Sequence, residues 1–309
     1  MDTQIVLGGH RGFGCTDHLF YQRIRPVADL PVENTLRSFE MAFAHGASYV
    51  ELDVVMSADG ELFVLHNVRA QDHFFECPIP PKRLNKLLFK DIKDHPTGSM
   101  RSGKIATFAE ALACIATHVS VDNPWVVNVE IKGVQGAYQS YENKFFIEKI
   151  AQTVEASAIP PEKVLFSSFC FENIMRMSHL LPQAKYGILF CENRVGGPIY
   201  RNNKSNIYFQ YWPLKKGYID FALSVWQQRA HPQSKLGYIH PETMTVTKPI
   251  VAYAAERGLG INIWDFFAAF DRKRTEKINK IIGLCDEYNV SLTAITDYLP
   301  QMQRLFVKK

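Results

Sequence analysis

SYVELDVVMSADG, residues 48–60, predicts a buried strand that carries two carboxylates. Glu51 and Asp53 are separated by one leucine, and side chains two positions apart on a strand point to the same face. Like charges held close together in a low-dielectric environment repel each other, so they require a cation or a shared proton. The pair therefore suggests a divalent metal site, although an E-x-D pair on an exposed strand is usually just solvated.

Length and composition indicate one globular domain. The chain has 309 residues, 47% apolar and 21% charged, a size that suits a decorated (β/α)8 barrel. A net charge of +4 is too small to indicate a nucleic-acid partner. No stretch approaches the roughly 18 apolar residues that a membrane-spanning helix needs, and the N-terminus lacks a signal-peptide pattern. Six cysteines without C-x-x-C spacing fit reduced thiols, so we expect a cytoplasmic protein without a transmembrane segment.

Strand and helix patterns alternate along the whole chain, without a break in composition that would mark a linker. Strands are expected at residues 5–7, within 48–60 ahead of a turn at 58–60, and at 62–65, 125–132, 164–169, 186–190, 218–225, 236–239, 259–264 and 292–296. Helices are expected at residues 34–45, 107–118, 143–157, 171–181, 247–258 and 276–288. Such alternation predicts a parallel sheet, open or closed. No G-x-G-x-x-G motif follows the first strand and no Walker lysine loop is present, which argues against a nucleotide-binding Rossmann fold.

Polar side chains gather where the predicted strands end. They are His10, Glu51, Asp53, His66, Glu130, Lys132, Ser168, Trp264 and Asp297. A TIM barrel draws its catalytic groups from the ends of many strands in this way. We therefore predict a TIM barrel over residues 1–309, with an insertion at 67–104 after the strand that delivers His66. Residues 191–247 are a candidate lid or specificity region.

These motifs, in this order, resemble the glycerophosphodiester phosphodiesterase family over nearly the whole chain. The matching pieces are His10-Arg11-Gly12, Glu33-Asn34-Thr35, Glu51-Leu52-Asp53, His66, Glu130-Ile131-Lys132, Ser167-Ser168-Phe169, Ile263-Trp264-Asp265 and Thr296-Asp297 with Pro300. Residues 191–247 are covered least. The family usually has an aspartate directly after its second histidine, where this chain has Asn67. This difference from the family pattern bears on how His66 is placed.

The resemblance implies the catalytic and metal-binding residues. His10 and His66 would be the acid–base pair, with Arg11 as a further catalytic residue. The ligands of one divalent cation, Mg²⁺ or Ca²⁺, would be Glu51, Asp53 and Glu130, with Glu33 beside them.

The same resemblance implies how the substrate is held. Arg11 and Lys132 would bind the phosphate, and Phe169 and Trp264 would line the part of the site that takes the alcohol or glycerol. The expected reaction is metal-dependent hydrolysis of a glycerophosphodiester to glycerol 3-phosphate and an alcohol. The residues leave open whether the nucleophile is water or the neighbouring glycerol hydroxyl.

Three alternatives remain open from the sequence. Residues 191–250 hold eight Lys or Arg against three Asp or Glu, with an aromatic cluster at 208–212, which would suit a lysophospholipid substrate and a lysophospholipase D. Asn67 would suit a catalytically weakened member that binds phosphodiesters. A phospholipase C-like barrel that cleaves phosphoinositides is the more distant alternative, because the carboxylate set fits it less well.

Overall fold

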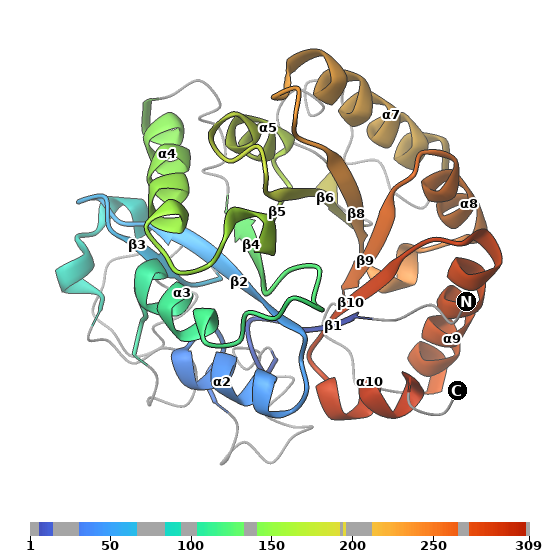
Figure 1. The fold of residues 1–309 in the computed structure, drawn as a ribbon, viewed down its shortest axis with the longest axis horizontal. Helices are drawn as coiled ribbons and strands as arrows, with labels where there is room; N and C mark the ends of the chain where they lie inside the picture. The colour runs from blue at the N-terminus through green and yellow to red at the C-terminus, as the bar shows by residue number, and fades with distance from the viewer. Residues whose placement is uncertain are drawn as a thin grey trace.

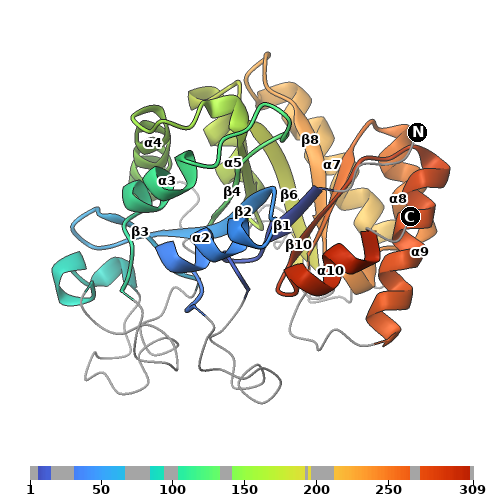
Figure 2. The same ribbon diagram turned by 60° about the horizontal axis from the view of Figure 1, so that its bottom comes forward.

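Eight parallel strands close into a barrel (Figures 1 and 2). The computed structural model describes residues 6–14, 31–66, 84–93, 104–132, 141–191, 194–195, 212–264 and 272–306. The barrel strands are β1 (Val6–Gly9), β2 (Tyr49–Met56), β4 (Val127–Ile131), β5 (Val164–Ser168), β6 (Lys185–Cys191), β8 (Leu236–Pro241), β9 (Gly260–Trp264) and β10 (Leu292–Thr296). Strand β1 pairs with both β10 and β2, which closes the ring and confirms the predicted TIM barrel.

Helices surround the barrel on its outside (Figure 1). They are α2 (Leu36–Ala44), α3 (Phe108–Ala116), α4 (Tyr141–Glu155), α5 (Phe171–Leu180), α7 (Trp212–Arg229), α8 (Lys248–Glu256), α9 (Arg272–Tyr288) and α10 (Leu299–Phe306). The main core fills the space between these helices and the outward faces of the strands. On β2, Val50, Leu52 and Val54 are fully buried in that core. The side chains that alternate with them therefore point into the interior of the barrel.

The strand that leads to His66 is antiparallel and lies outside the barrel. Strand β3 (Leu62–Val64) pairs with the end of β2 as a hairpin, so the expectation that it belongs to the parallel sheet is wrong. Gly60 permits the turn, because its φ of +82° is unfavourable for residues with a Cβ. The hairpin folds back along β2, and the Leu65 N–H donates to the Asp53 carbonyl at 3.0 Å. His66 therefore reaches the Asp53 level of β2 from the side.

Residues 218–225 are helical, so the strand predicted there is wrong. They lie within α7, whose buried side chains Tyr218, Ile219, Ala222 and Trp226 follow the helical spacing of one, four and eight positions. The run of tyrosine, isoleucine and phenylalanine favours a strand by composition, but its periodicity is that of a helix. Helix α10 and the two-residue strand β7 (Arg194–Val195), which pairs with β6, were not predicted.

Part of the predicted insertion forms a small cluster beside the hairpin. Two short 3₁₀ turns, η3 (Leu84–Lys86) and η4 (Phe89–Asp91), lie in residues 84–93, and Ile92 packs on Phe63 and Leu65. The rest of 67–103 and residues 196–211 lie outside the described residues, so the insertion and the candidate lid stay predictions.

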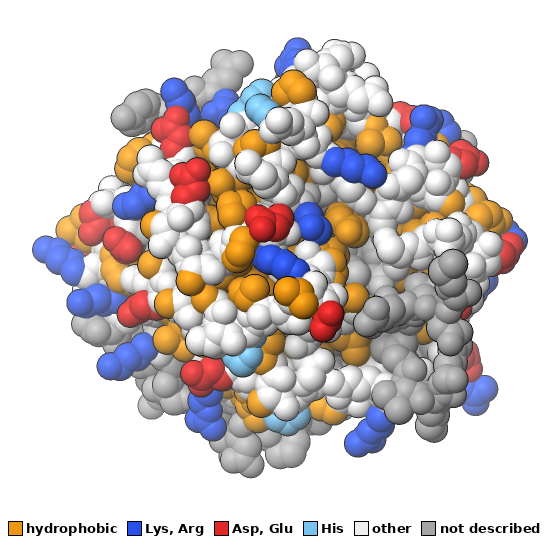
Figure 3. Space-filling view, viewed as in Figure 1, with side chains coloured by type: hydrophobic (Ala, Val, Ile, Leu, Met, Phe, Trp, Pro, Cys, Tyr) orange, Lys and Arg blue, Asp and Glu red, His pale blue; other side chains and the backbone are white. Residues whose placement is uncertain are grey.

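The described helices and the described part of one face of the surface bear on membrane association and charge. Within the described helices, none is both long and apolar enough to cross a bilayer. Figure 3 shows Lys and Arg side chains interspersed with Asp and Glu over the described part of the face seen in Figure 1. Such mixing is what the small net charge of +4 predicts.

Candidate active site

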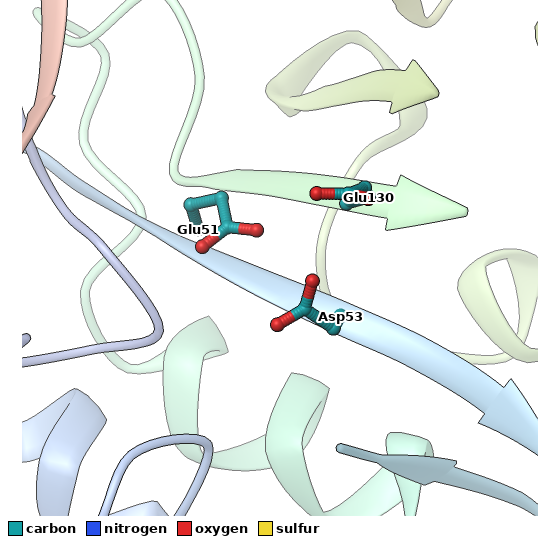
Figure 4. A group of neighbouring side chains, drawn as sticks. All are labelled: Glu51, Asp53 and Glu130. Carbon is teal, nitrogen blue, oxygen red and sulfur yellow. The ribbon is translucent and has the colours of Figure 1, made fainter. Parts of the chain in front are cut away.

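Three carboxylates from two adjacent strands meet inside the barrel (Figure 4). Glu51 and Asp53 come from β2 and Glu130 from β4, with Asp53 directly opposite Glu130 in the parallel register. One oxygen of each lies within 4.8 Å of one oxygen of the other two. Glu51 and Asp53 are almost completely buried and Glu130 is partly buried. The structure thus brings together the three predicted metal ligands.

Two cationic side chains lie among these acids. Lys132 Nζ is 2.8 Å from Asp53 Oδ1 and 2.6 Å from Glu130 Oε1. Arg11 Nη1 donates to Glu33 Oε1 at 2.7 Å, and its Nε lies 3.6 Å from Asp53 Oδ2. Glu33 is therefore an ion-pair partner of Arg11 and does not belong to the group of three. Its predicted place beside the cation remains a prediction.

The charges in this cluster do not balance. Counting Glu33, Glu51, Asp53 and Glu130 against Arg11 and Lys132, two negative charges are in excess when all six groups are ionised. That excess equals the charge of one divalent cation. The lysine and the arginine neutralise half of the acids only.

The pKa values of the acids express the same excess. Burial, and next the Asp53 carboxylate, raise the pKa of Glu51 to about 8. Burial also raises the pKa of Glu130. For Asp53, burial acts to raise the pKa, but the positive charges of Lys132 and Arg11 outweigh it and hold that pKa well below its usual range. A site of converging carboxylate oxygens with uncompensated charge fits a hard divalent cation such as Mg²⁺ or Ca²⁺.

His10 is held at the edge of this cluster. It follows β1, and its Nδ1 lies 2.8 Å from Asp297 Oδ1 while its Nε2 lies 4.0 Å from Glu51 Oε2. Burial acts to lower the pKa of His10, but the Asp297 and Glu51 carboxylates outweigh it and leave the pKa above its ordinary value. One ring nitrogen is therefore anchored, and the other faces the carboxylates.

His66 lies beside the same group in a different electrostatic setting. Burial, followed by the positive charges of Arg11 and Lys132, holds the pKa of His66 well below its ordinary value. The imidazole is therefore neutral at neutral pH. The two predicted histidines thus share one site but differ in the direction of their pKa shifts. Asn67 lies outside the described residues.

The loop after β1 is fixed by contacts to the acids. Arg11 has a φ of +52°, and its N–H donates to Glu51 Oε2 at 2.9 Å. Gly12 has a φ of +91°, and a Cβ there would lie 2.4 Å from Ser38 Oγ, so this position requires glycine. The predicted His-Arg-Gly motif therefore places both His10 and Arg11 against Glu51.

An aromatic pair lies at the ends of β5 and β9. The rings of Phe169 and Trp264 meet edge-on with centroids 5.9 Å apart, and the indole Nε1 donates to the His240 carbonyl at 2.9 Å. The structure brings these two predicted substrate-binding residues together. Their role toward a substrate is still a prediction.

Two residues that contact the site were not assigned a role from the sequence. Asp297 was noted at the end of the last strand but given no role, and Asn34 belongs to the Glu-Asn-Thr motif but was likewise passed over. Asn34 Nδ2 donates to Asp53 Oδ2 at 2.9 Å. A polar residue at a strand end was the signal for Asp297, but its partner His10 lies 287 positions away.

Sequence comparisons identify relatives of this chain. The profile of the glycerophosphoryl diester phosphodiesterase family matches residues 10–268. A protein of uncharacterised function from Mycoplasma genitalium is 28% identical over 197 residues, which cover 62% of this chain and 69% of that protein. A glycerophosphodiester phosphodiesterase from Caldanaerobacter subterraneus is 26% identical over 163 residues, which cover 51% of this chain and 61% of the enzyme.

A solved structure has the same fold over its full length. The phosphodiesterase of Oleispira antarctica, in complex with the product sn-glycerol 3-phosphate, superposes with a TM-score of 0.64. The superposition covers 98% of this chain and 96% of that one, at 17% sequence identity. At this identity the likeness establishes the fold.

Proposed function

The chain belongs to the glycerophosphoryl diester phosphodiesterase family, and from that premise we propose that it hydrolyses a glycerophosphodiester to glycerol 3-phosphate and an alcohol. The observation that carries the proposal is the meeting of Glu51, Asp53 and Glu130 within 4.8 Å, beside two histidines and two cationic side chains. A phosphodiester is a stable monoanion with a poor leaving group. Its cleavage needs positive charge, an activated nucleophile and a proton donor.

One divalent cation would be held by Glu51, Asp53 and Glu130. When bound, it supplies Lewis-acid chemistry, drawing negative charge from the non-bridging phosphate oxygens. The oxygen-only donor set favours Mg²⁺ or Ca²⁺ over softer metals.

Arg11 and Lys132 would bind the phosphate. Both are already held among the carboxylates by ion pairs, so their charge is in place before a substrate arrives. Charged donors fixed in this way stabilise developing negative charge without reorganisation at the moment of reaction. Phe169 and Trp264 would provide an apolar wall for the carbon skeleton of the alcohol or glycerol.

His10 and His66 would move the protons. One imidazole takes a proton from the nucleophile, which is water or the glycerol hydroxyl, and the other gives a proton to the departing alkoxide oxygen. A positioned acid or base of this kind contributes about 10²–10⁴ in rate. Asp297 holds the His10 ring through Nδ1, which leaves Nε2 directed toward the carboxylates and available to a substrate there.

The experiment is hydrolysis of glycerophosphocholine, followed by release of glycerol 3-phosphate. We expect chelator to abolish turnover and Mg²⁺ or Ca²⁺ to restore it. His66→Ala should lower turnover by about 10²–10⁴, since it removes one of the two proton carriers. His179→Ala, which removes an exposed histidine of α5, is the matched control and should be as active as the unchanged protein.

Two results would contradict the proposal. Hydrolysis that persists in chelator would show that the reaction does not need the cation. Normal turnover of His66→Ala would exclude His66 from the mechanism. Binding of the substrate without any hydrolysis would favour the alternative of a catalytically weakened, phosphodiester-binding member.

A second candidate substrate is a lysophospholipid. The observation in its favour is the excess of eight basic over three acidic residues in 191–250, together with the aromatics at 208–212. Comparing glycerophosphocholine with a long-chain lysophosphatidylcholine distinguishes the two. A strong preference for the lipid would make the chain a lysophospholipase D.

A cytoplasmic location also stays a proposal. It is supported by six cysteines without C-x-x-C spacing, of which Cys114, Cys170 and Cys285 are free thiols.

A further inference from the structure

We propose that Asn34 is a positioning residue that couples the cation ligand Asp53 to the loop that carries His10 and Arg11. The inference rests on the proposed function, since it assumes that Asp53 binds a cation. It concerns a side chain that would touch neither the cation nor the substrate.

Asn34 joins two separate parts of the site. Its side-chain Nδ2 donates to Asp53 Oδ2 at 2.9 Å, and its Oδ1 accepts from the Asp53 backbone N–H at 3.4 Å. Its own backbone N–H donates to the Arg11 carbonyl at 2.9 Å. Asn34 is almost fully buried, so solvent does not compete for these bonds. The residue thus bonds a predicted ligand on one side and the His10-Arg11-Gly12 loop on the other.

The backbone at this junction has an uncommon conformation on both sides. Asn34 has a φ of +56° and Arg11 a φ of +52°, and the hydrogen bond between their main chains links them directly. Asparagine accepts positive φ more readily than most residues because its short amide can bond locally. Such conformations cluster at functional sites and persist because their surroundings hold them. Asparagine at position 34 therefore does two things. It adopts the positive φ, and its side-chain amide donates to Asp53.

The amide fixes the orientation of the Asp53 carboxylate. Asp53 Oδ2 is bound to Asn34, while Oδ1 faces Lys132 Nζ at 2.8 Å. Without the amide, Oδ2 would lose its hydrogen-bond donor and the carboxylate could rotate about its own axis, so its alignment with Glu51 and Glu130 would be lost. Partners that orient a metal ligand in this way typically contribute 10- to 100-fold to metal affinity.

The test uses two asparagines of this chain with the same backbone conformation. Asn289, directly after α9, has a φ of +53°, and it is exposed to solvent. Asn34→Gly and Asn289→Gly both remove an amide while keeping positive φ accessible. Cation-free protein is titrated with Mg²⁺ and with Ca²⁺ by calorimetry, and its thermal unfolding is recorded without cation.

We expect Asn34→Gly to bind the cation about 10- to 100-fold more weakly, while Asn289→Gly binds as the unchanged protein does. Without cation, Asn34→Gly should also unfold at a lower temperature, because it removes two buried hydrogen bonds to Asp53, so the cation affinity is the deciding measurement. A merely structural role would lower the unfolding temperature of Asn34→Gly but leave its cation affinity unaltered, which would overturn the inference.

A second measurement needs no variant. In the unchanged protein, the side-chain amide resonances of Asn34 should shift in step with cation binding, because the amide is bonded to a ligand. Unaltered resonances at saturating cation would overturn the inference and leave the proposed function standing. A chain that binds no divalent cation at all would overturn both.

Discussion

At the scale of single residues, the contact between His10 and Asp297 shows how one side chain orients another. The carboxylate holds Nδ1 of the ring at 2.8 Å, so the imidazole cannot turn its other nitrogen away from Glu51. An acid at this position fixes both the tautomer and the orientation of the imidazole. The ring and its anchor come from opposite ends of the chain, which meet because β1 pairs with β10.

Replacing this anchor should affect turnover more than binding. Asp297→Asn keeps the size of the side chain but removes the charge that favours the ring's N–H at Nδ1. We expect kcat to fall by about 10²–10⁴ with little change in KM, since the lost contribution concerns proton transfer. Steady-state kinetics on glycerophosphocholine give both constants. An unchanged kcat would exclude Asp297 from the mechanism.

Single residues were predictable where the signal was local. The two-residue period of a strand placed Glu51 and Asp53 on one face, and Glu130 and Lys132 on another strand, as the structure has them. The partners of these residues were not predictable in the same way. The bonds of His10 to Asp297 and of Asn34 to Asp53 depend on how strands and loops meet, which no periodicity records.

At the scale of elements, β6 and β8 show how the interior of the barrel is packed. Gly187 of β6 lies directly beneath the ring of His240 of β8, and a Cβ at Gly187 would lie 2.3 Å from His240 Nε2. The histidine is fully buried, and neither ring nitrogen has a hydrogen-bond partner among the described residues. The small residue on one strand thus makes room for the large one on the next.

Gly187→Ala should therefore destabilise the protein by about 1–3 kcal/mol, because a fully buried ring would have to move. The matched control is Gly283→Ala on the exposed side of α9, where a Cβ would meet nothing within 4 Å. That change should instead stabilise by about 0.5–1 kcal/mol, as helix interiors favour alanine over glycine. Denaturant unfolding measures both. Equal effects of the two substitutions would contradict this account of the interior.

The sequence predicted most elements, but it did not predict the direction of β3 or the nature of α7. The apolar run at 62–65 indicates a strand, yet nothing in its period distinguishes antiparallel pairing outside the barrel from a place within it. In α7, aromatic and β-branched residues favour a strand by composition. The buried stripe of Tyr218, Ala222 and Trp226 shows that packing on the barrel decides the structure.

At the scale of the whole molecule, burial of His240 links stability to pH. Burial lowers the pKa of His240 to about 3, whereas an unfolded chain would protonate this side chain near its ordinary value of 6.5. Between these values the unfolded state binds one proton more than the folded state. Stability is therefore lost as the pH falls through this range, by up to about 1.4 kcal/mol per pH unit.

His240→Leu tests this linkage, since it removes the titrating group. We expect the free energy of unfolding of the variant to fall less steeply than that of the unchanged protein between about pH 6 and pH 4. Denaturant unfolding at several pH values measures the two slopes. Parallel slopes would show that His240 does not contribute to acid sensitivity.

The whole molecule is a barrel whose interior acids carry two negative charges in excess of Arg11 and Lys132 when all of them are ionised. We infer that one divalent cation compensates them. The most direct test of this inference is a crystal structure with Ca²⁺ and glycerol 3-phosphate bound. We expect a single ion contacted by oxygens of Glu51, Asp53 and Glu130, with Lys132 and Arg11 on the phosphate. An ion bound elsewhere, or Lys132 still bridging Asp53 and Glu130 with no ion between the acids, would contradict it.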